Sequence, residues 1–408
     1  MTDAGQAIAA ARSQVVAALA ARLRDLDQAE EAFAEACAAA IPAWRRDPPR
    51  DPAAWLWRAA LRNAFDAKRR LAVRTRAVHD ERPPAPTPED ELLAADAPIP
   101  DERLRLIFVC CHPAVGPEAR AALTLKVVCG LSTERLARAF LVAEPAMLQR
   151  ITRAKRKIRD AGVSFEVPAR DAWNERLEAV LATLEIAYAQ AYEDAGLTED
   201  AAPFAEEVLR LSGLLAELMP REPEVLGLAA LVRYAEARRP ARLDEGGAMI
   251  PPSLQDVLLW RADLIAEGVR LLDNAARHGE PGPRQLMAAI HGAHLSRRET
   301  GVTPWADIVS LYDGLMHFRP DPVTAVNRAV AVGEARGMRE GLAALEAVPG
   351  GGRLAAWLPY QAARAALCEG AGLAADAASA YRAALSLKPA PAERLYLERR
   401  LAGLALSR

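Results

Sequence analysis

Apolar residues recur at three- and four-residue spacing along most of the chain, which is the pattern of amphipathic helices. The spacing is clearest near position 150, where Met147, Ile151, Ala154 and Ile158 fall on one side of a helix. No long alternating run of β-branched residues occurs, and no Asn-Gly hairpin turn interrupts the helical spacing. The pattern therefore predicts an all-α fold.

The chain has 408 residues, more than one ordinary core holds, so several domains are expected. We predict a helical module over 8–75 and a linker over 76–100, where prolines and acids favour an extended, solvated chain. A second compact helical module follows over 101–162. A long helical region with repeat character then occupies 168–408.

The segment from 117 to 160 predicts two helices joined by a short turn, preceded by another helix. Pro117 suits the start of the preceding helix, and Gly130 suits the position just after its end. Ser132 is placed to cap a short helix, and Pro145 starts a longer one after a three-residue break. Two helices with a tight turn and a basic second helix are typical of a helix-turn-helix.

The second of these helices is the candidate DNA-reading element, because no acid occurs between Pro145 and Arg159. In a major groove its early outward residues would meet base edges, and its later cations would meet phosphates. A solvated surface is the alternative for any basic helix face, and the turn and caps favour DNA. The candidate DNA-binding residues are Gln149, Arg150, Arg153, Lys155, Arg156 and Lys157.

Composition limits the other functions. The formal net charge is −2, so attraction to nucleic acid must come from a local patch. The sequence lacks a Walker loop, a G-x-S-x-G elbow, an H-E-x-x-H motif and a dinucleotide fingerprint. We therefore expect a protein that is not an enzyme and that uses no cofactor.

The five cysteines are widely spaced and form no C-x-x-C pair, which favours a reducing, cytoplasmic location. No secretory leader or membrane span is expected from the hydropathy pattern. Cys110 and Cys111 lie in the stretch LIFVCCHP, which raises the question of a metal site. Adjacent helical side chains point about 100° apart and do not easily hold one ion. We interpret the stretch as a core helix capped by Asp101, with no metal site.

Three stretches resemble extracytoplasmic-function sigma factors of the sigma-70 family. LSTERLARAFLVAEPAMLQRITRAKRKIRDAG resembles region four, which reads the −35 promoter element. DLDQAEEAFAEA and PAAWLWRAALRNAFDAKRR resemble region two, which docks on core RNA polymerase and opens the −10 element. With RLRLIFVCCHPA and a helical C-terminal half, the chain resembles a subgroup that carries a tetratricopeptide-like extension. The resemblance implies core RNA polymerase and promoter DNA as partners, with activity tuned by the extension.

The resemblance also implies roles for residues in the first module. The residues that match the polymerase-facing acidic helix are Asp27, Glu30, Glu31 and Glu35. The residues that match the helix facing the −10 element are Asn63, Asp66, Lys68, Arg69 and Arg70. Ala34 and Leu148 depart from the residues common at their positions, so one polymerase contact and the −35 preference stay open.

The C-terminal half contains candidate helix pairs. The clearest covers 355–389 and resembles a tetratricopeptide repeat, whose period is about 34 residues. His291 and His294 share a helix face, and we interpret them as packing residues, with ligand binding as the alternative. The resemblance further implies a small DGPF-motif protein, or another ligand, as a partner of the repeats.

A second function also fits these patterns. A helix-turn-helix regulator fused to an interaction domain would bind DNA without touching polymerase, and it would act as a symmetric dimer on its operator. That interpretation leaves the similarity of 8–75 to region two unexplained. We therefore expect a promoter-specificity subunit of RNA polymerase.

Overall fold

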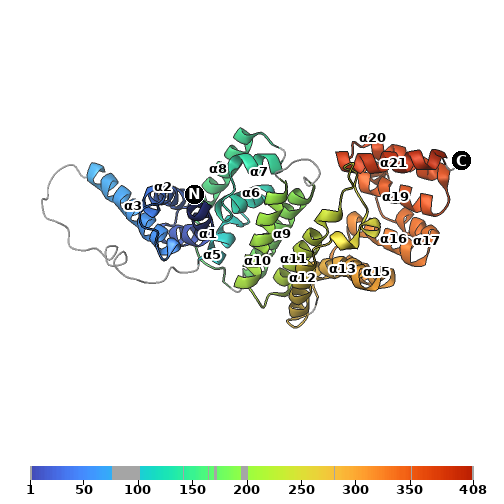
Figure 1. Cartoon of the computed structure of the whole chain (residues 1–408), viewed down its shortest axis with the longest axis horizontal. Coiled ribbons are helices and arrows are strands. Elements are labelled where there is room, and N and C mark those ends of the chain that lie inside the picture. The colour runs from blue at the N-terminus through green and yellow to red at the C-terminus, as the bar shows by residue number, and fades with distance from the viewer. Residues whose placement is uncertain are drawn as a thin grey trace. The chain divides into compact units, whose positions relative to one another are not determined.

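A computed structural model of the chain describes residues 2–75, 102–140, 142–163, 165–169, 172–193, 201–279, 281–350 and 352–406. Within these ranges the regular elements are helices, and β-type pairing is limited to an isolated bridge between Leu243 and Met249. This confirms the all-α fold class (Figure 1). The chain divides into two compact units, Met1–Ala191 and Tyr192–Arg408. The predicted linker over 76–100, and the predicted cap Asp101, lie outside the described residues.

The first unit begins with a bundle of three mutually packed helices: α1 (Thr2–Leu23), α2 (Leu26–Trp44) and α3 (Pro52–Thr75). Their shared core contains Val16, Leu19, Phe33, Leu56 and Phe65, all less than a tenth exposed. Burial of these side chains holds the bundle together, at about 1.5–3 kcal/mol for each large one.

The first unit continues with five further helices: α5 (Arg103–Cys110), α6 (Pro117–Val127), α7 (Thr133–Ala139), α8 (Glu144–Asp160) and α9 (Trp173–Glu193). Helix α5 packs against α1, and this joins the two halves of the unit. Helix α9 packs against α5, because the Trp173 ring lies 5.5 Å from the Phe108 ring and Arg176 donates to the Phe108 carbonyl at 2.6 Å. The division between the units falls within α9, later than position 168 where the sequence interpretation begins the C-terminal region.

The second unit is a succession of helices. In chain order they are α10 (Ala201–Leu218), α11 (Pro223–Ala237), α12 (Ala262–Ala275), α13 (Pro283–Leu295), α14 (Arg297–Thr300), α15 (Trp305–Phe318), α16 (Pro322–Arg336), α17 (Met338–Glu346), α18 (Gly352–Ala355), α19 (Leu358–Gly370), α20 (Ala374–Ser386) and α21 (Pro391–Leu406). Three short 3-10 turns lie between α11 and α12: η2 (Arg239–Ala241), η3 (Pro252–Leu254) and η4 (Val257–Leu259).

The core of the second unit is a chain of small clusters, each sharing a helix with the next. Helix α13 contributes Ala288 to one cluster and Ile290 to the next. Helix α16 links that cluster to a third, and α19 links the third to the last, which contains Tyr381. Such a core depends on contacts between helices that are adjacent along the chain, as in stacked helical repeats.

Close approach of helices in this unit depends on residues without large side chains. A Cβ on Gly341 of α17 would lie 2.5 Å from the Cα of Gly333 in α16, so neither position accepts a side chain without movement. In the pair predicted over 355–389, Ala365 and Ala384 are fully buried between α19 and α20. These helices are present where the sequence predicts them.

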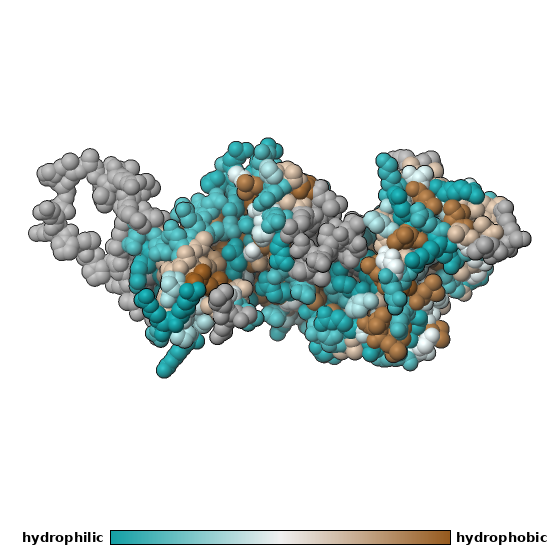
Figure 2. Space-filling model, turned by 45° about the horizontal axis from the view of Figure 1, so that its top comes forward, coloured by the Kyte–Doolittle hydropathy of each residue, from teal (hydrophilic) through white to brown (hydrophobic). Residues whose placement is uncertain are grey.

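The surface differs between the two units. On the face drawn in Figure 2, brown apolar surface gathers over the second unit, whereas the first unit is mostly teal. Exposed apolar side chains of the second unit include Leu254 and Leu258, which are 65% and 81% exposed. Within the part of the chain that the structure describes, no helix is both long enough and apolar enough to cross a membrane.

Candidate nucleic-acid and partner interface

Helix α8 is positioned by its buried side and by its ends. Met147, Ile151, Ala154 and Ile158 are buried, which is the inward face that helical spacing predicts. The helix starts at Glu144, and Pro145 occupies its first turn, where a missing N–H has no cost. Its buried side faces α6 and α7, since α8 packs against both.

The turn before α8 is built by the caps that the sequence indicates. Gly130 follows α6 with a φ of 78°, a conformation that L side chains rarely adopt. Ser132 then caps α7, because its hydroxyl accepts from the backbone N–H of Arg135 at 3.1 Å. Short α7 and longer α8 thus lie in contact, joined by a few residues.

The remaining surface of α8 divides into two faces. Gln149, Arg153 and Arg156 follow at spacings of four and three, so they share an open face, and Lys157 lies beside it. These four side chains are exposed. Arg150 is the exception among the early candidates, because its guanidinium pairs with Glu118 of α6 at 3.2 Å.

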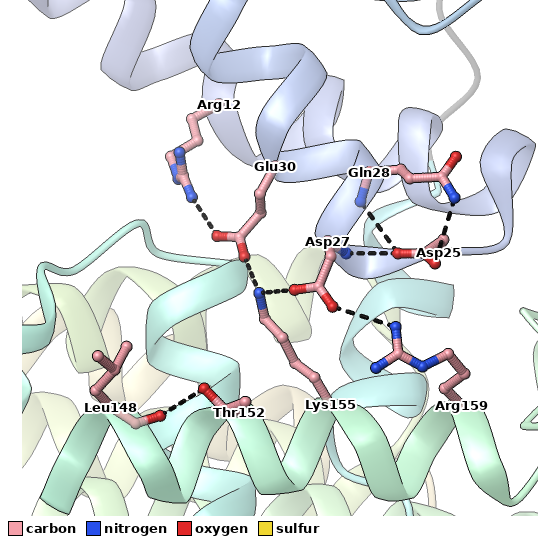
Figure 3. A network of polar contacts seen from close by, with 9 residues as sticks. All are labelled: Arg12, Asp25, Asp27, Gln28, Glu30, Leu148, Thr152, Lys155 and Arg159. Carbon is pink, nitrogen blue, oxygen red and sulfur yellow. Dashed lines mark hydrogen bonds and ion pairs between the residues drawn. The ribbon is translucent and has the colours of Figure 1, made fainter. Parts of the chain in front are cut away.

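The other face of α8 is turned toward α2. Leu148, Thr152, Lys155 and Arg159 follow at spacings of four, three and four, and Figure 3 shows them along the side of α8 nearest α2. Lys155, a predicted DNA-binding residue, therefore lies on a different face from Arg153. Sequence spacing alone places it outside the core but does not say what it meets.

Four side chains join α2 to α8, and we call them the clasp: Asp27, Glu30, Lys155 and Arg159 (Figure 3). The Lys155 ammonium lies 2.7 Å from Asp27 Oδ1 and 2.7 Å from Glu30 Oε2. Arg159 lies 3.6 Å from the second oxygen of Asp27. Arg12 of α1 pairs with the other Glu30 oxygen at 3.1 Å, so Glu30 is held from two sides.

The first turn of α2 fixes the acidic half of the clasp. The Asp25 carboxylate caps the helix by accepting from the backbone N–H groups of Asp27 and Gln28, at 2.8 and 3.0 Å. Asp27 and Glu30 lie three residues apart, so both carboxylates lie on one side of α2. The chain reaches this cap through Arg24, a non-glycine residue with a φ of 55°.

Burial distinguishes the two arms of the clasp. The Lys155 and Glu30 side chains are 14% and 17% exposed, whereas Arg159 and Asp27 are 58% and 51% exposed. Exposed ion pairs contribute little to stability, so the Lys155–Glu30 pair dominates. Burial disfavours the charged form of Lys155, but the two carboxylates more than offset it and raise the pKa of Lys155 above its ordinary value. A cavity of about 260 Å³ lies beside the clasp, lined in part by Asp25, Asp27 and Arg159.

The other two predicted polymerase-binding residues do not take part in the clasp. Glu31 and Glu35 are exposed on α2, whereas Asp27 and Glu30 belong to the clasp. The structure therefore brings two predicted polymerase-binding residues into contact with one predicted DNA-binding residue. Sequence reasoning missed Arg12 and Arg159, and the signal for Arg159 was its four-residue spacing from Lys155.

The predicted −10 residues lie on α3. Asn63 is half-buried and Asp66 is exposed. The side chains of Lys68, Arg69 and Arg70 lie outside the described residues, although the backbone of α3 extends through them. The structure thus describes the backbone of the helix that carries these candidates.

The cysteine pair belongs to the core. Cys110 and Cys111 are buried, and the Cys111 sulfur lies 3.3 Å from the Thr124 hydroxyl. Burial raises the pKa of both thiols, so they stay protonated at neutral pH. In the described ranges no group of three or more His, Cys, Asp or Glu side chains could hold a metal ion.

The fold and this interface define an all-α protein in which a basic helix is held against an acidic one by buried charge. A family model described as a family of unknown function (DUF6596) matches residues 176–276, from the start of α9 to just beyond α12. An uncharacterized protein of Rhizobium meliloti (strain 1021) is 40% identical over 414 residues, covering 99% of this chain and 97% of that protein. The chain therefore belongs to the same protein family as this Rhizobium protein. No solved structure matches the chain.

Proposed function

We propose that the chain is a promoter-specificity subunit of RNA polymerase, of the extracytoplasmic-function sigma type. The observation that carries the proposal is the open face of α8, where Gln149, Arg153 and Arg156 are exposed on a helix seated by a short capped helix. A helix in this setting enters the major groove with its open face toward the bases. Lys157, beside that face, reaches phosphate oxygens.

The first three helices support the polymerase half of the proposal. Helix α2 carries an acidic side with Glu31 and Glu35 exposed, which is the chemistry of a docking surface for a basic partner. Helix α3 lies against α2 and extends to the basic segment that matches the promoter-facing helix. A helix-turn-helix regulator that does not bind polymerase would leave this arrangement of α2 and α3 unexplained.

The clasp gives the proposed factor a closed form. Asp27 and Glu30 neutralise Lys155. In this form, two acids proposed to bind polymerase and a lysine proposed to bind DNA are paired with each other. A partner that binds α2 through these acids competes with Lys155 and releases it for phosphate. Binding of polymerase and of DNA would then be coupled, because each partner favours the open clasp.

Complex formation with core polymerase tests the proposal. The purified chain is mixed with bacterial core RNA polymerase and examined by analytical ultracentrifugation. We expect a one-to-one complex that Glu31→Lys combined with Glu35→Lys weakens strongly. Failure of the wild-type chain to bind polymerase, together with binding of a symmetric DNA site as a dimer, would favour a helix-turn-helix regulator instead.

A further inference from the structure

Arg238 of the second unit is a buried cation that has no acidic partner among the described residues. It follows α11 directly and is 5% exposed. Among the described residues its side-chain hydrogen bond goes to His291, with the guanidinium NH2 3.1 Å from Nδ1 of the imidazole, and its Nε has no partner. The neighbouring acid Glu236 is already bound to Arg239 at 2.6 Å.

This arrangement is unusual energetically. Moving an arginine charge out of water costs several kcal/mol unless an anion or a full set of hydrogen bonds replaces the water. Arg284 is another buried arginine among the described residues of this unit, and it has the usual kind of partner, because it lies 3.6 Å from the Glu224 carboxylate. Arg238 has a neutral imidazole in the place where a carboxylate would be expected.

His291, which contacts Arg238, is a neutral donor of a hydrogen bond. Burial and the charge of Arg238 hold the pKa of His291 well below its ordinary value, so the imidazole is neutral at pH 7. Its Nδ1 accepts from Arg238, which leaves the proton on Nε2 free to be donated elsewhere. Tyr312 lies within reach of the charge of Arg238, and it keeps its hydroxyl proton because burial raises its pKa to about 12.

A second positive charge, that of Arg297, adds to the positive electrostatic potential near Arg238 and the two histidines. Arg297 acts on His294, the neighbour of His291 one turn further along α13. Its guanidinium is held by the carbonyls of Pro252 and Gln255, at 3.1 and 2.6 Å, rather than by an acid. His291, His294 and Tyr312 are half-buried, so each keeps part of its surface exposed.

We propose that Arg238, His291 and Tyr312 form a binding site for an oxyanion, the carboxylate or phosphate group of a small ligand. The bound anion supplies the negative charge that Arg238 lacks and accepts from the imidazole Nε2–H and the phenol. The site uses α11, α13 and α15, which pack in that order, so occupancy stiffens the middle of the second unit. The proposal stands apart from the function of α8 and does not depend on it.

Isothermal titration of the full chain with inorganic phosphate, and separately with succinate, tests the site. We expect saturable binding of at least one of the two, and the tighter one identifies the anion. Arg238→Met should weaken it at least about ten-fold, since a charged hydrogen bond contributes about 1.5–3 kcal/mol. Arg277→Met is the control, because Arg277 is an exposed arginine at the end of α12 in the same unit.

A milder variant separates binding from folding. Tyr312→Phe removes one hydroxyl and leaves the ring, so it keeps the packing of α15 while weakening the anion about three- to ten-fold. Circular dichroism confirms that each variant is folded before titration. The proposal is overturned if wild type binds neither anion. It is equally overturned if wild type, Tyr312→Phe and the folded Arg238→Met protein bind with the affinity of Arg277→Met.

Discussion

Lys155 and Arg153 lie two residues apart on one basic helix, and their surroundings differ completely. Arg153 is exposed, whereas Lys155 is 14% exposed between two carboxylates. Helical spacing predicted which residues of α8 are buried, because the apolar stripe depends on local sequence alone. It could not predict the partners of Lys155, because Asp27 and Glu30 lie more than a hundred residues earlier.

The open face of α8 leads to a prediction for single residues. Under the proposed function, Arg153→Ala should reduce discrimination between promoter sequences by about 1–3 kcal/mol, the contribution of one bidentate contact to a base. Lys157→Ala should weaken binding to all sequences alike and reduce the salt slope by about 0.9. Fluorescence anisotropy with a cognate and a scrambled duplex, over a range of salt concentrations, measures both. Identical profiles for the two variants would contradict this division of roles.

His294 gives a prediction about pH. Burial, with repulsion from Arg238 and Arg297, lowers the pKa of His294 from 6.5 to about 4. As pH falls, His294 is therefore protonated at a higher pH in the unfolded chain than in the folded chain. The contribution of the neutral His294 to the free energy of unfolding is complete above pH 6.5 and is lost as pH falls through about 4. Wild type should lose up to about 3 kcal/mol more unfolding free energy over this range than His294→Gln. Urea unfolding at several pH values checks this, and parallel pH curves for the two proteins would refute it.

For the helices, the sequence predicted existence and order from local signals, whereas their roles stay predictions. Helix α8, the turn before it and the pair α19–α20 follow from caps, prolines, glycines and apolar spacing, which are local signals. Two features could not be predicted because they depend on long-range contacts: the packing of α9 on α5, and the clasp between α2 and α8. The clasp joins residues whose charges look like ordinary solvated surface when each helix is considered alone.

The clasp leads to a prediction for DNA binding by the chain in the absence of polymerase. Glu30→Gln should weaken the hold on Lys155, which Asp27 alone then keeps, and raise affinity for a nonspecific duplex up to about five-fold, which corresponds to about 1 kcal/mol for the lost pairing. Glu31→Gln removes the same charge from the same helix without touching the clasp, so it reports the general effect of a missing acid. Anisotropy at low salt compares the two variants. Equal affinities would show that the clasp does not occlude α8, whatever the outcome with polymerase.

At the scale of the whole molecule, the chain is two compact units with different construction. The first has cores shared among several helices, and the second has a succession of clusters linked by single helices. Composition and spacing predicted an all-α protein of several parts. They placed the start of the C-terminal region at 168, and the division between the compact units falls within α9, whose contact with Phe108 no local signal in the sequence reveals.

Truncation tests this division. A chain ending at 193 keeps α9 and should unfold cooperatively, whereas a chain ending at 168 exposes Phe108 and loses its contacts with Trp173 and Arg176. We expect the shorter chain to melt about 5–10 °C lower, in line with a loss of a few kcal/mol from a domain of this size. Thermal unfolding followed by circular dichroism measures it. Equal melting temperatures would assign α9 to the second unit.

Mapping of transcript starts with purified core RNA polymerase and genomic DNA tests directly whether the chain is a promoter-specificity subunit. We expect that adding the chain produces starts at a defined set of promoters with a common upstream element. We also expect that Arg153→Ala changes which of these promoters are used. Core polymerase that initiates at the same places with and without the chain would contradict the proposal.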